Sequence, residues 1–248
     1  MPKNRVLSSL TSRETMKFLF LASHGLRTPL SAIRWGCGRL RKMRKDRTPE
    51  EHHVIDQIHH NARKLTTVLG SMLTLAKLEE EAYRMKEEAI LLCELIQHSA
   101  DTLEFEGEPQ WDIRCPGELT VMADRALLET IVRDLLWLCA ESTRPERATM
   151  IRAEASDGAL DISFYAALEL PFLNPGASGL EDELSTVIGG TPGLLLSLTG
   201  ALAKFLDGTV ELTRVDPLEL KTLQEEGVET EEIRDDEYRI TLRLPLSY

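Results

Sequence analysis

A histidine, a threonine and a serine near the start of the chain are spaced so that a helix would place them on one side. Thr28 is four positions after His24, and Ser31 is three positions after Thr28. Side chains at these spacings are neighbours on a helix surface. An exposed imidazole on a rigid helix can meet a reactive group on another protein. From these residues alone, a surface histidine without a function is the other interpretation.

The surrounding stretch predicts the helix that would position them. From Leu19 onward, apolar side chains recur every seven residues, and this heptad pattern is typical of helices that form bundles. One core position holds Leu19, Leu26, Ile33 and Leu40, and the other holds Ala22, Pro29, Gly36 and Met43. His24 then lies on the solvent side. Because Pro29 removes the hydrogen bond to the Gly25 carbonyl, we expect a bend one turn after His24.

A second helix is predicted to follow after a short turn. Its apolar series is again spaced by threes and fours: Ile55, Ile58, Ala62, Leu65, Leu69, Met72 and Ala76. Thr48 is the expected N-cap, with Pro49 in the first helical position and Glu51 completing a capping box. Two antiparallel helices cannot bury a two-sided apolar seam by themselves, so we expect a homodimer that forms a four-helix bundle.

From about Leu91 the pattern changes to alternating helix and strand signals, which predict an α+β sandwich as a second domain. The expected helices are Leu91–Glu104, Ala123–Ala140 and Pro192–Leu206. The expected strands are Leu119–Met122, Thr149–Ala155, Leu160–Tyr165, Thr209–Arg214 and Tyr238–Pro245. The predicted division is an N-terminal segment over 1–12, a helical hairpin over 13–86 and the sandwich over 87–248. An acidic stretch, 216–237, is expected to be a solvated or partly helical insertion.

The run SHGLRTPLSAI, residues 23–33, resembles the H-box of two-component histidine kinases, in which the phospho-accepting histidine precedes an acidic residue and then Leu-Arg-Thr-Pro-Leu. Residues 61–65 and 73–79 resemble the end of the same family's dimerisation hairpin. The remaining chain resembles its GHKL-type ATP-binding domain in order and length. The resemblance implies that His24 accepts a phosphoryl group and that the bundle docks the receiver domain of a response regulator.

The ATP-binding motifs of that family are altered in this sequence. Leu138 stands where the resemblance implies a magnesium-ligating asparagine, and a leucine offers no oxygen to a hard cation. Ala166, Leu168 and Leu170 replace the adenine-recognising aspartate and two glycines of the first glycine box. Leucines crowd the second glycine box, residues 191–196, where close phosphate approach needs space. We therefore expect binding of ATP and Mg²⁺ to be lost.

The resemblance and its departures lead to one preferred function and three alternatives. We expect a protein that transfers phosphoryl groups through His24 without ATP-dependent autophosphorylation, since Gly25 also replaces the acidic residue that activates the histidine. Arg27, Ser31, Arg34 and Trp35 are the expected partner-binding residues. The alternatives are a pseudokinase scaffold, a response-regulator phosphatase that uses Thr28, and a divergent active kinase.

Other features weigh against further sites. The scattered cysteines Cys37, Cys93, Cys115 and Cys139 suggest buried small side chains rather than zinc ligands or disulfides. The histidine pairs 52–53 and 59–60 are seven residues apart, which favours a solvated face over a metal site. Trp35 is expected either to anchor an interface or to pack within the protein.

Charge and hydropathy limit the partners and the location. The net charge of −12 argues against nucleic acid, and the basic run Arg34–Arg47 is better explained as an exposed helix end or a docking surface for an acidic partner. No apolar run is long enough to span a membrane, and the first ten residues lack the apolar core of a signal peptide. We expect a cytoplasmic protein without membrane insertion.

Overall fold

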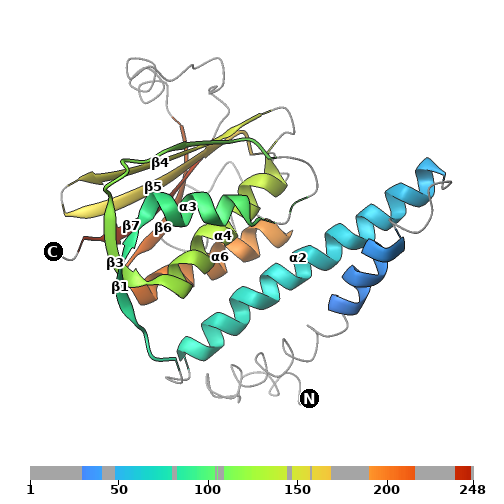
Figure 1. Cartoon of the computed structure of the whole chain (residues 1–248), viewed down its shortest axis with the longest axis horizontal. Helices are drawn as coiled ribbons and strands as arrows, with labels where there is room; N and C mark the ends of the chain where they lie inside the picture. The colour runs from blue at the N-terminus through green and yellow to red at the C-terminus, as the bar shows by residue number, and fades with distance from the viewer. Residues whose placement is uncertain are drawn as a thin grey trace, which may run out of the picture. The chain divides into compact units, whose positions relative to one another are not determined.

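The computed structural model describes residues 30–40, 48–79, 83–103, 105, 109–143, 147–156, 158–168, 190–215 and 238–246 (Figure 1). They belong to two compact units, Met1–Arg84 and Met85–Tyr248, each of which is described by itself. The expected N-terminal segment 1–12 and the acidic stretch 216–237 lie outside the described residues.

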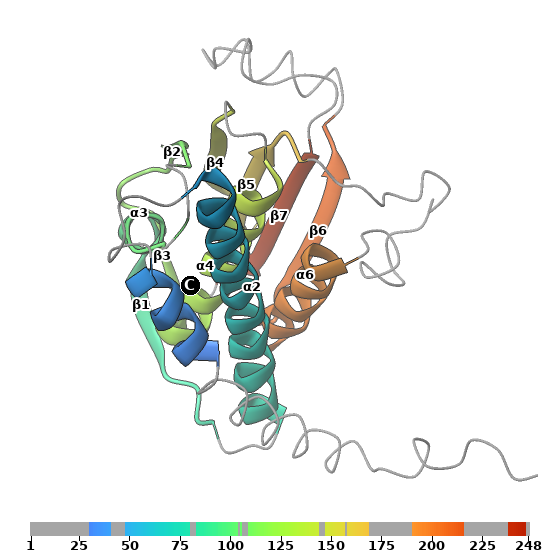
Figure 2. The same ribbon diagram turned by 90° about the vertical axis from the view of Figure 1, so that its right-hand side faces the viewer.

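The described residues of the first unit form two helices. Residues 30–40 are helical, and α2, Pro49–Glu79, follows; the two run side by side in Figures 1 and 2. The predicted capping box is confirmed at the start of α2. The Thr48 backbone N–H donates to Glu51 Oε2 at 3.1 Å, and the Glu51 N–H donates to Thr48 Oγ1 at 3.2 Å. Each side chain thus satisfies a backbone donor that the first turn leaves without a helical partner.

Within residues 30–40, the chain buries a different side of the helix from the counted seam. Leu30 and Cys37 are buried, whereas Ile33 is 44% exposed and Leu40 is 48% exposed. The heptad count therefore identified an apolar series correctly but did not identify which series one chain covers. A single chain supplies one neighbouring helix in the hairpin, and one neighbour covers only one stripe of the surface.

The second unit is built on a five-stranded sheet with strand order β2-β4-β5-β7-β6. Its strands are β2 Trp111–Arg114, β4 Thr149–Ser156, β5 Ala159–Ala166, β6 Thr209–Arg214 and β7 Tyr238–Pro245. The β2–β4 pair is parallel, and every other neighbouring pair is antiparallel. A separate antiparallel ribbon pairs β1, Glu87–Leu91, with β3, Thr120–Asp124.

In the described part of this unit, three helices cover one face of the sheet: α3 Leu92–Asp101, α4 Arg125–Ser142 and α6 Gly190–Ala203 (Figure 1). A short 3-10 helix, η1 Lys204–Leu206, extends α6 toward β6. The core lies between the helices and the sheet, where Leu135, Ile162 and Ile240 are fully buried. This layering confirms the predicted α+β sandwich after a helical hairpin.

Two strands and one covalent link differ from the expectations. β1 and β2 were not predicted, and α3 begins at Leu92 because the residues before it pair with β3. Cys93 and Cys115 form a disulfide across 22 residues of sequence, so the expectation of four unbridged cysteines was wrong for these two. Cys37 and Cys139 are free and buried, as expected. The β1–β3 ribbon explains the pairing, since it brings the two cysteines together from distant positions.

Candidate phosphotransfer helix and candidate nucleotide site

The described part of the first helix presents a polar and aromatic surface. Trp35 is 65% exposed, and the guanidinium carbon of Arg39 lies 4.8 Å from the centre of its ring. This cation–π contact holds the indole against the helix while one face stays open. Ser31, four residues earlier, is also exposed, whereas Arg34 is half-buried. His24, Arg27 and Thr28 lie outside the described residues.

Apolar side chains are exposed on both helices of this unit. Ile33 and Leu40 are seven residues apart, and so are Ile58 and Leu65. Their exposed fractions are 44% and 48% on the first helix and 45% and 54% on α2, where Val54 is 52% exposed. Large apolar side chains that recur at heptad spacing and remain exposed are typical of a helix face that meets another helix.

The histidine pairs of α2 are not uniformly solvated. His59 is only 8% exposed, which corrects the expectation of a solvated face at that position. His52 Nδ1 lies 3.2 Å from the Thr48 carbonyl oxygen, which also accepts a hydrogen bond from the His52 backbone N–H at 3.1 Å. Across the described ranges, no group of three His, Cys, Asp or Glu side chains is placed to hold a metal ion.

Helix α4 bears the residues that align with the magnesium-binding motif. Its N-cap Asp124 accepts a hydrogen bond from the Leu127 N–H at 3.0 Å. Asp134 and Leu138 lie more than two turns into the helix and are buried, with exposed fractions of 4% and 1%. The next residue, Cys139, is fully buried, and burial raises the pKa of its thiol to about 12. The helix therefore points its motif positions into the core.

The end of β5 bears the residues that align with the first glycine box. Ala166 is fully buried and Leu168 is 6% exposed. The Leu168 N–H donates to the Ala166 carbonyl at 2.9 Å, and Leu168 bridges to Thr143 just beyond α4. Leu170 lies outside the described residues. The chain thus turns tightly here without the glycines of the family pattern.

The start of α6 bears the residues that align with the second glycine box. Gly193 is buried in the first turns, and Leu195 and Leu196 are fully buried. Helices α4 and α6 pack against each other (Figure 2). At the altered positions, Leu138, Ala166, Leu168, Leu195 and Leu196 are buried apolar residues, whereas Leu194 of the second glycine box is 46% exposed.

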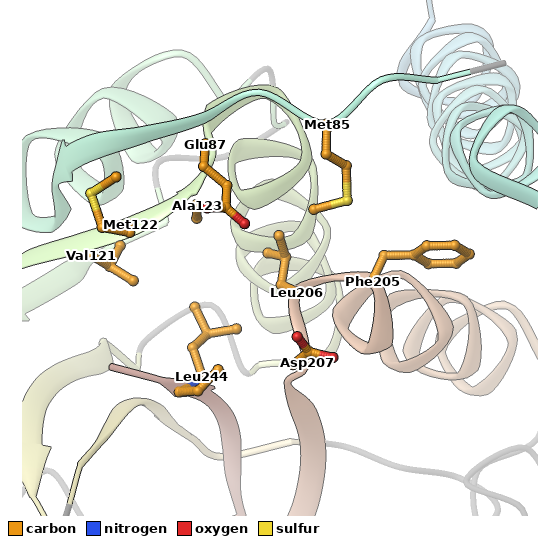
Figure 3. A pocket seen from close by; sticks show the side chains of 10 residues that line it. Met85, Glu87, Val121, Met122, Ala123, Phe205, Leu206, Asp207 and Leu244 are labelled. Carbon is orange, nitrogen blue, oxygen red and sulfur yellow. The ribbon is translucent and has the colours of Figure 1, made fainter. Parts of the chain in front are cut away.

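A separate small hollow, with a volume of about 60 Å³, lies between the β1–β3 ribbon, the turn after η1 and the end of β7 (Figure 3). Met85, Met122 and Phe205 contribute apolar side chains, and Glu87 and Asp207 contribute carboxylates. None of the residues that align with the ATP-binding motifs lines it. Sequence reasoning missed this hollow, because its walls come from four separate segments between residues 85 and 245 that only the fold brings together.

Among the described residues, no helix is both long enough and apolar enough to cross a membrane.

Comparison with known proteins assigns the helical hairpin to a known domain family. Residues 17–81 match the His Kinase A (phospho-acceptor) domain. The sensor histidine kinase TrcS of Mycobacterium tuberculosis is 30% identical over 143 residues, which cover 57% of this chain and 28% of TrcS. The histidine protein kinase DivJ of Caulobacter vibrioides is 28% identical over 155 residues, covering 59% of this chain and 25% of DivJ. The chain thus spans about a quarter of the length of these relatives.

Solved structures show the same fold. Full-length ShkA, determined in complex with AMPPNP, superposes with a TM-score of 0.56 at 17% identity over 93% of this chain and 46% of ShkA. The Acinetobacter baumannii histidine kinase AdeS gives a TM-score of 0.53 at 14% identity over 91% of this chain and 98% of that structure. The phospho-acceptor domain over residues 17–81 and the two sequence relatives identify the chain as histidine kinase-like, and the solved structures show that it shares their fold.

Proposed function

We propose that this protein is a two-component signalling protein that docks the receiver domain of a response regulator and transfers phosphoryl groups through His24 without using ATP. The observation that best supports the proposal is the contrast between the two units. The first matches a phospho-acceptor domain that includes His24. In the second, the altered nucleotide-binding positions Leu138, Ala166 and Leu195 are at most 1% exposed.

The residues at those positions do not fit a magnesium nucleotide. Mg²⁺ requires oxygen ligands in near-octahedral geometry, and a leucine supplies none. Adenine recognition requires a polar partner, and Ala166 has no side-chain donor or acceptor. Opening the packed interface between α4 and α6 would also expose apolar surface to water, which costs about 25 cal/mol of free energy per Å² exposed. These three costs act together, so we expect autophosphorylation from ATP to be lost.

Phosphoryl transfer from an aspartyl phosphate requires fewer groups from this chain than autophosphorylation from ATP does. The phosphorus–oxygen bond to the receiver carboxylate breaks, a phosphorus–nitrogen bond to the imidazole forms, and the ring proton passes to solvent. The receiver supplies the Mg²⁺, and docking supplies alignment. Exposed Trp35, braced by Arg39, supports the first helix as the docking surface.

The phospho-acceptor bundle would be a homodimer. The exposed apolar side chains on residues 30–40 and on α2 are the surface that a second copy would cover. A second copy would also explain why Ile33, Leu40, Ile58 and Leu65 of the counted apolar series are exposed in one chain.

Receiver domains phosphorylated with labelled acetyl phosphate test the proposed transfer. We expect the label to appear on the wild-type chain and to be absent from His24→Gln, while both bind the receiver with similar affinity. Release of free phosphate that Thr28→Ala prevents would instead identify a phosphatase. Binding with neither reaction would identify a scaffold.

Calorimetric titration with Mg-ATP tests the other half of the proposal. We expect no binding heat at millimolar nucleotide. A one-to-one binding heat, together with label on His24 from ATP, would contradict the proposal and identify a divergent active kinase.

A further inference from the structure

The disulfide between Cys93 and Cys115 links the start of α3 to the end of β2. Cys93 is in the first turn of α3, and Cys115 directly follows β2. Both cysteines are half-buried, whereas Cys139 is fully buried. An external thiol therefore has access to these two sulfurs that it lacks to Cys139.

The two cysteines are held together by more than their covalent bond. The β1–β3 ladder pairs Leu91 with Thr120, and the Leu92 N–H donates to the Leu119 carbonyl at 3.0 Å. The turn between Cys115 and β3 is closed by a hydrogen bond from the Leu119 N–H to the Pro116 carbonyl, also at 3.0 Å. These backbone bonds do not depend on the disulfide, so the thiols of the reduced protein would stay adjacent.

The surroundings also suit the reduced state. Cys93 Sγ lies 3.0 Å from the Pro116 carbonyl oxygen. Once reduction lets the two sulfurs move apart from bonding distance, a Cys93 thiol close to that oxygen could donate to it, so the released donor would have an acceptor nearby. The folded protein can therefore accommodate both the bonded and the reduced form.

We propose that Cys93 and Cys115 are a reversible thiol–disulfide exchange site that opens and closes in the folded protein. A thiolate of an external thiol, such as glutathione, attacks one sulfur and forms a mixed disulfide. A second external thiol completes the reduction, so that two electrons enter the pair and two protons are taken up by the released thiolates. Oxidised glutathione reverses the reaction. Such pairs are the usual kind of disulfide in the cytoplasm, where this protein is expected.

The disulfide would control how often β2, the edge strand next to β4, opens. Among the described strands, β2 pairs only with β4, through four residue pairs, and its last residue, Arg114, directly precedes Cys115. In the oxidised form β2 is restrained in two ways. The hydrogen-bonded ladder holds it to β4, and the disulfide links the residue after its last position to α3. In the reduced form the second restraint is gone, so β2 opens more often while the central strands do not.

The test uses the full chain under native conditions in glutathione buffers that range from fully oxidised to fully reduced. Alkylation with iodoacetamide followed by peptide mass spectrometry measures the free thiols. We expect Cys93 and Cys115 to become labelled together in one two-electron transition that oxidised glutathione reverses. Cys139 should stay unlabelled, and the circular dichroism spectrum should not change.

Hydrogen exchange supplies the structural measurement. Amides of β2 should exchange at least about tenfold faster in the reduced protein, with no change in β5. Cys93→Ser should show the fast β2 exchange without reductant, while Cys139→Ala should keep the redox transition. The proposal is wrong if the pair reacts only after denaturation, or if both thiols stay free in fully oxidised glutathione.

Discussion

Gly208 has close neighbours where a side chain would begin. A Cβ atom built there would lie 2.7 Å from the Arg243 carbonyl oxygen and 2.6 Å from Leu244 Cδ2. The preceding residue, Asp207, has a left-handed backbone with φ of 52°, so the chain turns sharply from η1 into β6. The absence of a side chain at Gly208 lets this turn press against β7.

Replacing Gly208 with Ala should destabilise the second unit by about 1–3 kcal/mol, because a backbone oxygen cannot move aside as a flexible side chain can. Urea unfolding of the full chain measures the change. Gly117→Ala is the matched control, since a Cβ there has no neighbour within 4 Å, and it should change stability by less than about 0.5 kcal/mol. Equal effects of the two substitutions would contradict the steric explanation.

The thiol of Cys139 gives a pH dependence with a defined sign. Burial raises the pKa of this thiol from 9.0 to about 12, so the folded protein keeps the proton in a range where the unfolded chain loses it. The contribution to stability is complete below pH 9 and decreases as the pH rises from 9 to 12.

Cys139→Ala should therefore show a shallower loss of unfolding free energy with pH than the wild type over that window. Denaturant unfolding at a series of alkaline pH values measures both slopes. Parallel slopes would show that the thiol titrates alike in the folded and unfolded states.

Asp124 joins two elements of the second unit. One carboxylate oxygen accepts from the Leu127 N–H at 3.0 Å, at the start of α4, and the other accepts from the Lys86 N–H at 2.8 Å, just before β1. The side chain is 3% exposed. Both oxygens act as acceptors, and an asparagine has only one acceptor to offer.

Asp124→Asn should destabilise the second unit by about 1 kcal/mol through one lost bond, and Asp124→Ala by about 2 kcal/mol through both. Chemical denaturation measures the unfolding free energy of each variant. The control is Asp112→Asn, which removes a half-exposed ion pair with Arg114 and should cost less than about 1 kcal/mol. An equal loss for Asp124→Asn and Asp112→Asn would refute the assigned role.

The capping box makes a similar prediction for α2. Thr48→Ala removes the side-chain acceptor for the Glu51 N–H, and the first turn should lose about 1 kcal/mol of local stability. Amide hydrogen exchange at the start of α2 reports this loss. Thr66→Ala, which removes a mid-helix hydroxyl bonded to the Ala62 carbonyl, should leave that exchange unchanged, because its hydroxyl serves no N-terminal donor.

At the scale of the whole molecule, the exposed apolar side chains of the first unit predict self-association. Leu65 is 54% exposed in the middle of α2, and in the proposed four-helix bundle it would be buried against a second copy. A charge at that position would have no partner in a dry seam.

Leu65→Asp should convert the dimer into a monomer at micromolar concentration while keeping its helix content. Sedimentation equilibrium and circular dichroism make the two measurements. His53→Asp adds the same charge at an exposed position on another side of α2, and it should stay dimeric. A wild-type monomer would overturn the proposed assembly, and the phosphoryl-transfer assay would still test the proposed function separately.

The sequence alone determined those elements whose signals are local. The alternation of side chains predicted β6 and β7 with the bounds that the structure gives them, Thr209–Arg214 and Tyr238–Pro245. The Thr48 and Glu51 pattern predicted the start of α2 because the capping bonds span only three residues. The family followed from a short motif around His24, since a contiguous motif requires no knowledge of the fold.

Tertiary structure decided what depends on distant segments meeting. β1 and β2 are short strands of five and four residues that exist through their partners, and their own patterns are too brief to predict them. The Cys93–Cys115 bond and the burial of Leu138 and Leu195 likewise depend on elements brought together by the fold. Periodicity identifies an apolar stripe on a helix, but only packing determines which neighbour covers it, and this is why Leu30 and Cys37 are buried while Ile33 and Leu40 remain exposed.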